Sequence, residues 1–178
     1  MNFLKKTHDR TSLYATRDDF RGLFNTNSND LMLLSLLLTG NRETAARCFV
    51  AGLEDSVHAD SVFKEWAHTW AKRTIILSAI RTLQPHPEND AASLPDRAVP
   101  EFDIAPAAWK SRVEIRDVLA LNDFNRLVFV LCVLEGYSEH HCALLLACTP
   151  REVRNARDWA MAQIIKSTGA GVFQNVSA

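Results

Sequence analysis

The stretch Gly136–Arg157, GYSEHHCALLLACTPREVRNAR, predicts a short helix, a tight turn and the start of a longer helix. Ser138 is placed to cap the short helix. At the start of the longer helix, Thr149 and Glu152 have the spacing of a capping box, and Pro150 takes the first helical position, where proline is well tolerated. Together these signals predict a helix-turn-helix.

The longer helix has an apolar side and a polar side. We expect its inward stripe to consist of Val153, Ala156, Ala160 and Ile164. The outer side carries Arg151, Arg154, Asn155 and Asp158, with Arg157 near the border. In a helix-turn-helix that binds DNA, side chains near the start of the second helix reach base edges, where arginine suits guanine or phosphate and asparagine suits adenine. The same face is also consistent with an ordinary solvated surface, because residues 149–166 hold four basic and two acidic residues, a net charge of only +2.

The overall composition is that of an ordinary globular protein. The chain has 178 residues, of which 47% are hydrophobic and 23% charged, and its formal net charge of −1 excludes coating of nucleic acid by bulk charge. Its longest apolar run, residues 31–38, is far shorter than the ~20 residues that cross a bilayer. The start, MNFLKKTHDR, lacks the apolar run of a secretion signal, and none of the four cysteines forms a CxxC pair. We therefore expect a cytoplasmic protein with reduced thiols and no membrane partner.

Helical patterns dominate the chain and predict an all-α fold. In the first half we expect helices at residues 29–38, 42–53 and 61–83. Ser28 and Asn41 are candidate N-caps, and Gly40 is a candidate C-terminal stop. The run LMLLSLLL is apolar all round, so we expect it to be buried on every side.

A proline-rich segment divides the chain in two. Residues 84–106 hold five of the six prolines and several acidic residues, which predicts an extended linker. We expect an N-terminal helical domain at residues 1–84, the linker at 85–107 and a helix-turn-helix domain at 108–178. In the last of these we expect helices at residues 109–120, 123–134 with Asn122 as the cap, 138–146, and from Pro150 to Ile164 or Lys166.

The sequence shows no clear pattern of catalytic or metal-binding residues. His140, His141, Cys142 and Cys148 lie close together, but their spacing matches no common zinc pattern. A phosphate-binding glycine loop and an evident pair of catalytic carboxylates are both missing from the sequence. We therefore expect no metal, no cofactor and no enzymatic activity.

Residues 118–164 resemble region 4 of bacterial RNA polymerase sigma factors, of the small two-domain extracytoplasmic-function type. The similarity lies in Leu121, Arg126, the VFVL core, the LEGYS block and the TPREVRNAR start of the recognition helix. In that family this region binds the upstream promoter element. The resemblance therefore implies that promoter DNA is contacted by Thr149, Arg151, Arg154, Asn155 and Arg157.

The first half is similar to region 2 of the same family. The matching segment is FKEWAHTWAKRTIILSAIRTL, residues 63–83. The residues in it that could act in promoter melting are Phe63, Trp66, Trp70, Lys72 and Arg73. The three aromatic ones are equally good core residues. Region 2 also has a helix that binds the polymerase clamp. At that position residues 43–57 read ETAARCFVAGLEDSV and depart from the family's acidic and apolar pattern.

The resemblance implies a sigma-factor-like protein of transcription initiation or regulation, whose N-terminal domain binds core RNA polymerase. An anti-sigma or other regulatory protein is a further partner of the kind that this family has. The alternative is a divergent sigma-like protein that no longer initiates transcription and acts as a protein-interaction or regulatory module. The departure at residues 43–57 and the low net charge favour that alternative.

Overall fold

The computed structural model describes residues 13–87 and 113–174, with side chains described up to residue 167. The described residues are helical apart from turns, short connections and one isolated backbone bridge between Tyr14 and Phe63, so the predicted all-α fold is confirmed. The chain divides into two compact units, Met1–Thr82 and Leu83–Ala178. Residues 88–112 lie outside the described residues, and they include most of the linker predicted at residues 85–107. In the described part of the chain, no helix has both the length and the apolar character needed to cross a membrane.

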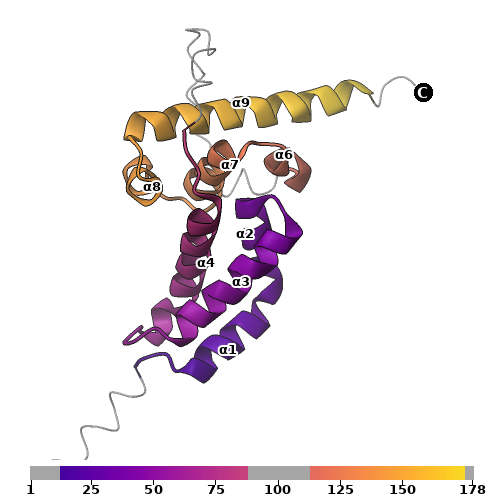
Figure 1. Ribbon diagram of the computed structural model, residues 1–178. Helices are drawn as coiled ribbons and strands as arrows, with labels where there is room; N and C mark the ends of the chain where they lie inside the picture. The colour runs from indigo at the N-terminus through magenta and orange to yellow at the C-terminus, as the bar shows by residue number, and fades with distance from the viewer. Residues whose placement is uncertain (1–12, 88–112, 175–178) are drawn as a thin grey trace, which may run out of the picture. The chain divides into compact units, whose positions relative to one another are not determined.

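From residue 13 onward, where the structure describes it, unit 1 consists of four α-helices and one short 3₁₀ turn (Figure 1). The elements are α1 (Arg17–Thr26), α2 (Ser28–Thr39), α3 (Arg42–Val57), the turn η1 (Lys64–Trp66) and α4 (Ala67–Leu83). Asn41 caps α3 as predicted, because its side chain accepts hydrogen bonds from the backbone N–H groups of Glu43 and Thr44. The prediction for α2 was wrong by one residue: Asn27 is the N-cap, and Ser28 is the first helical residue.

The leucine-rich helix α2 is buried on one side only, which corrects the expectation of burial all round. Leu31, Leu34 and Leu38 are at most 5% exposed, whereas Met32 and Leu33 are 37% and 38% exposed. Helix α2 packs against α3 and α1, and these neighbours cover a single flank. Gly40 ends the helix in the left-handed conformation, as predicted, at φ 69°.

The long helix expected from Ser61 begins only at Ala67. The 3₁₀ turn η1 precedes it, and before that turn the backbone around Phe63 pairs with the segment that precedes α1. The N–H of Ala15 donates to the carbonyl of Val62 at 2.7 Å, and the N–H of Lys64 donates to the carbonyl of Leu13 at 2.9 Å. This pairing satisfies backbone groups that a helix would otherwise have used, so the helix starts after it.

Helices α3 and α4 approach most closely at Gly52. A Cβ atom placed on Gly52 would lie 2.6 Å from the Cγ1 atom of Ile75 and 3.1 Å from its backbone nitrogen. The hydroxyls of Ser56 and Thr74 both donate to the carbonyl of Gly52, at 2.7 Å and 3.0 Å. The contact therefore requires a residue without a side chain at position 52.

Unit 2 contains α6 (Ile115–Leu119), α7 (Asp123–Phe129), a π-helical segment η3 (Val130–Leu134), α8 (Glu139–Leu146) and α9 (Pro150–Gln174) (Figure 1). Asn122 caps α7 as predicted, by accepting from the backbone N–H of Asn125. Helix α9 continues past Lys166, where we expected it to end, because no proline follows and the backbone ladder can extend. The part of the predicted helix 109–120 before residue 113 lies outside the described residues.

The core of unit 2 forms where α9 packs against α6, α7 and α8. Its fully buried apolar side chains include Val118, Leu127, Leu131, Val153 and Ile164. Arg126 is also buried, at 4% exposure; it pairs with Asp123 and donates to the carbonyl of Leu121 at 2.8 Å. This arginine ties the turn before α7 to the helix itself.

We predict opposite effects for alanine at two helical glycines of unit 1. Gly52→Ala should lower the free energy of unfolding by ~1–2 kcal/mol, because overpacking at buried Ile75 outweighs the gain in helix propensity. The control Gly22→Ala has open space around its Cβ and should raise that free energy by about 0.5–1 kcal/mol. Chemical denaturation of both variants measures this; a neutral Gly52→Ala would contradict the close approach.

Candidate nucleic-acid interface

The two helices of the predicted helix-turn-helix are joined by a sharp, well-defined turn. The hydroxyl of Ser138 caps α8 by accepting from the backbone N–H of His141 at 3.2 Å. Helix α8 ends at Ala147, whose left-handed conformation has φ 52°. The backbone N–H of Cys148 then donates to the carbonyl of Ala143 at 3.0 Å. The chain therefore leaves α8 in a direction that the backbone itself fixes.

Helix α9 starts with the predicted capping box. The hydroxyl of Thr149 accepts from the backbone N–H of Glu152 at 3.2 Å, and the Glu152 carboxylate accepts from the backbone N–H of Thr149 at 2.7 Å. The Thr149 hydroxyl also donates to that carboxylate at 2.7 Å. Bonds from the Thr149 backbone and hydroxyl lower the pKa of Glu152. Thr149, one of the predicted DNA-binding residues, thus has its side chain engaged in holding the helix start.

The inward stripe of α9 lies as predicted. Val153, Ala156, Ala160 and Ile164 are all at most 6% exposed. Because these four residues fix which side of α9 faces the core, they also fix which side faces solvent. Arg151 and Arg154 are exposed, and Asn155 and Arg157 are partly exposed.

One acidic residue of α8 holds two of the three arginines of α9. The Oε2 atom of Glu139 lies 2.9 Å from Nη2 of Arg154, and its Oε1 atom lies 2.6 Å from Nη1 of Arg157. Arg157 also pairs with the neighbouring Asp158 at 2.8 Å. Arg151, by contrast, forms no ion pair with any residue that the structure describes.

These ion pairs change the electrostatics of the proposed DNA-binding surface. The bonds to Glu139 raise the pKa of Arg154; for Arg157, burial opposes ionisation, but Asp158 and Glu139 outweigh it and raise the pKa. The motif carries three carboxylates, those of Glu139, Glu152 and Asp158, beside its three arginines, although none of them pairs with Arg151. These six side chains therefore sum to zero charge, whereas residues 149–166 alone, which include Lys166 and leave out Glu139, carry +2.

An aromatic cluster in unit 1 contains two of the residues considered for promoter melting. The Phe63 ring stacks on Tyr14 with centroids 4.8 Å apart and meets Trp66 edge-on at 5.1 Å. Trp66 is 58% exposed. Trp70 instead packs against the core cluster around Phe20, and its indole N–H is buried with no acceptor among the described residues. The structure thus separates the two tryptophans, one facing solvent and one facing the core.

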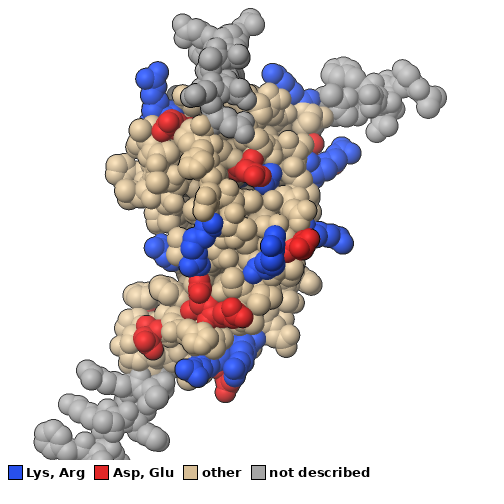
Figure 2. All heavy atoms as spheres, viewed as in Figure 1, with Lys and Arg blue, Asp and Glu red and all other residues tan. Residues whose placement is uncertain are grey.

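The basic candidates of unit 1, Lys72 and Arg73, are both half-buried on α4. Elsewhere, basic side chains lie in small groups with acidic and uncharged groups between them on the face seen in Figure 2. We find no continuous basic surface there that would hold DNA by charge alone. On this face, a specific contact with DNA would therefore depend on the shape and side chains of a local motif.

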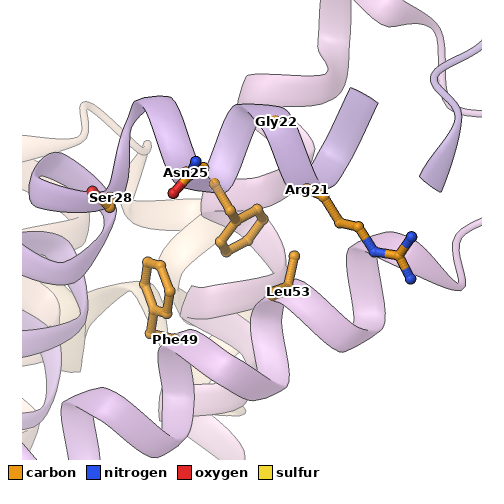
Figure 3. A pocket seen from close by; sticks show the side chains of 7 residues that line it. Arg21, Gly22, Asn25, Ser28, Phe49 and Leu53 are labelled. Carbon is orange, nitrogen blue, oxygen red and sulfur yellow. The ribbon is translucent and has the colours of Figure 1, made fainter. Parts of the chain in front are cut away.

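A solvent-open hollow of about 460 Å³ lies between α1, the start of α2 and α3 (Figure 3). Its floor is apolar, formed by Phe24, Phe49 and Leu53, and Arg21, Gly22, Asn25 and Ser28 complete its lining. Val50, on the next position of α3, is 51% exposed. Phe49 and Leu53 lie on α3, within residues 43–57, the segment that the predicted resemblance to region 2 would make the polymerase-binding helix.

In the described ranges, no group of three or more His, Cys, Asp and Glu side chains converges on a point where a metal ion could sit.

Comparisons with models of protein families, with curated proteins and with solved structures found no match to this chain.

Loss of the capping box should both weaken the fold and change its response to acid. Thr149→Ala should cost ~1 kcal/mol of stability, the usual effect of losing an N-cap. The pKa of Glu152 is lowered in the folded state, so its contribution is present above its ordinary value of 4.5 and is lost as the pH falls through the folded value.

The matched control is Ser138→Ala, which removes a cap that has no carboxylate partner. Both variants should be destabilised at neutral pH, but only Thr149→Ala should lose less stability than the wild type on acidification. Denaturation curves between neutral pH and pH values below 4.5 measure this. Equal acid sensitivity in wild type and Thr149→Ala would contradict the role of Glu152.

Proposed function

We propose that this chain is a sigma-factor-like protein of transcription initiation or regulation. The helix-turn-helix α8–α9 would bind promoter DNA, and unit 1 would bind core RNA polymerase. The observation that carries the proposal is the firmly capped start of α9 with Arg151, Arg154 and Asn155 on its accessible side. That arrangement offers a recognition helix whose outer side, in its first two turns, stays accessible while Val153 and Ala156 face the core.

The arginines would not contribute equally to DNA binding. Arg151 lies in the first turn of α9 and forms no ion pair within the described residues, so it is available to a phosphate or a guanine. Arg154 and Arg157 must first exchange Glu139 for a DNA group. Such an exchange gains little free energy, because one ion pair replaces another. DNA binding by this motif is therefore weak by itself and suits a protein that polymerase holds near the promoter.

In unit 1, the hollow beside α3 supports the second half of the proposal. Phe49 and Leu53 present apolar surface in it, and exposed Val50 extends that surface. An apolar face on a helix, with Arg21 at the edge, suits burial against a partner protein. We assign core RNA polymerase to this surface because the helix lies at the position of the family's clamp-binding helix.

A second candidate function follows from the ion pairs of Glu139. A motif whose basic side chains are neutralised internally also suits a divergent sigma-like protein that binds or regulates another protein. In this candidate the helix-turn-helix has lost its function in initiation. Binding to core polymerase without binding to promoter DNA would favour it over the first.

We predict that removing Glu139 strengthens DNA binding and that removing the arginines weakens it. Glu139→Gln frees Arg154 and leaves Arg157 paired with Asp158 alone, and it should increase affinity for duplex DNA about fivefold, the scale of a surface ion pair. Arg154→Ala should weaken binding by ~1–3 kcal/mol if it reads a base. Arg151→Ala should reduce the salt slope by ~0.9 if it binds one phosphate.

Fluorescence anisotropy of the full chain with labelled duplex pools, titrated at several salt concentrations, measures all three changes. The matched control is Arg47→Ala, which removes one exposed positive charge from α3, far from the motif in sequence. Its affinity should stay within twofold of the wild type. If the three variants of the motif bind DNA like the wild type, as the control does, the surface of α9 is not a DNA-binding surface.

A further inference from the structure

Two cysteines of unit 2 lie in direct contact. The sulfur of Cys132, in η3, is 3.1 Å from the sulfur of Cys142, in α8. Both are free thiols in this structure. The two residues are ten positions apart in sequence, and the turn at Gly136 brings them together. No sequence pattern pointed to this pair, because the spacing is not that of a CxxC or zinc motif.

The surroundings of the two thiols differ. Cys142 is fully buried on the inner side of α8, whereas Cys132 is partly exposed. A disulfide has a sulfur–sulfur bond of about 2.05 Å, so the sulfurs would need to approach by only about 1 Å. Cys132 is therefore the more accessible of the two residues, and the sulfur of Cys142 lies in contact with its sulfur.

We propose that Cys132 and Cys142 form an oxidation site, in which a hydroperoxide converts the two thiols to an intramolecular disulfide. This inference does not depend on the proposed function, because it rests on the contact between the two sulfurs and on the access to one of them. It adds a modification site to the helix-turn-helix unit.

The chemistry assigns a different role to each sulfur. The hydrogen bond with Cys142 lowers the pKa of Cys132 against the opposing effect of burial, and the positive charge of Arg157 lowers it further. The same hydrogen bond and burial raise the pKa of Cys142, which stays a thiol. Cys132 is therefore the attacking thiolate, and Cys142 is the thiol that completes the disulfide.

The proposed oxidation takes two steps. The Cys132 thiolate attacks one oxygen of hydrogen peroxide, the O–O bond breaks, and a sulfenic acid forms while the other oxygen leaves as water after taking up a proton. The sulfur of Cys142 then attacks the sulfenic sulfur; the S–S bond forms, the S–O bond breaks, and a second water leaves with the Cys142 proton. Overall, two thiols lose two electrons and two protons, and one peroxide becomes two waters.

The other two cysteines serve as internal controls. Cys48 lies in unit 1, and its closest polar contact is the hydroxyl of Thr82 at 3.7 Å. Cys148 is partly exposed, but burial and the Glu152 charge raise its pKa, which disfavours the thiolate. Neither of them has a sulfur partner at hydrogen-bond distance among the described residues. We expect oxidation to leave both as free thiols.

The disulfide would fasten η3 to the first helix of the helix-turn-helix. Cys142 lies one turn after Glu139 on α8, and Arg157, which pairs with Glu139, also influences Cys132 electrostatically. The oxidation site therefore lies beside the ion pairs that hold α8 and α9 together. The new bond closes a short loop between two elements that already pack against each other.

The test treats the reduced full-length chain with hydrogen peroxide and identifies the products by mass spectrometry. The expected result is a loss of two hydrogens in the monomer, a fall in reactive thiols from four to two, and a non-reducing peptide map that links Cys132 to Cys142. In Cys142→Ser, dimedone should instead trap a sulfenic acid on Cys132. Cys148→Ser is the matched control and should form the disulfide like the wild type.

The proposal is overturned if all four thiols survive peroxide, or if the map links Cys132 to Cys148 or to a second chain. The peptide map of the wild-type chain requires no substitution, so a variant that does not fold leaves the test intact.

Discussion

The turn between α8 and α9 fixes how α9 is placed against α8, and so determines which side chains the helix-turn-helix of unit 2 offers to a partner. It takes only three residues, because Ala147 adopts a left-handed conformation and Thr149 at once begins the capping box with Glu152. The short turn brings α9 back to the start of α8, so that Glu139 reaches Arg154 and Arg157, one and two turns into α9. A longer or looser turn would leave these charges apart and α9 without a fixed direction.

This constraint has an electrostatic consequence. A helix-turn-helix with three arginines on its second helix has the side chains for reading DNA, yet here two of them are paired within the protein. Internal pairing links α8 to α9, and in the proposed function it limits the free energy available for binding DNA. The same carboxylate thus connects the packing of the unit with its proposed function. The neighbouring thiols of Cys132 and Cys142 add a chemical group that responds to oxidants at that junction.

Local features of the fold could be predicted from the sequence, whereas long-range contacts could not. The caps at Asn41 and Ser138, the capping box at Thr149 and the inward stripe of α9 were predicted correctly, because each depends on side chains within four residues or on one helix period. The exposure of Met32 and the late start of α4 were missed, because they depend on which helices cover α2 and on backbone pairing with Tyr14.

The candidate site shows the same division. The sequence identified the side chains of α9 that face outward, but it could not show that Glu139 neutralises two of them, since Glu139 lies on another helix. Tyr14 of the aromatic cluster and the contact between Cys132 and Cys142 were missed for the same reason. The sequence indicates the pairing of Glu139 with these arginines only if the charges of both helices of the motif are considered together, and not those of α9 alone.

The most direct test of the account is transcription with the purified chain, core RNA polymerase and a pool of random promoter fragments. The account predicts specific start sites that core polymerase alone does not give. It also predicts an enriched upstream sequence motif that is lost when Arg151 and Arg154 are both changed to alanine. Absence of any start site beyond those of core polymerase would contradict it.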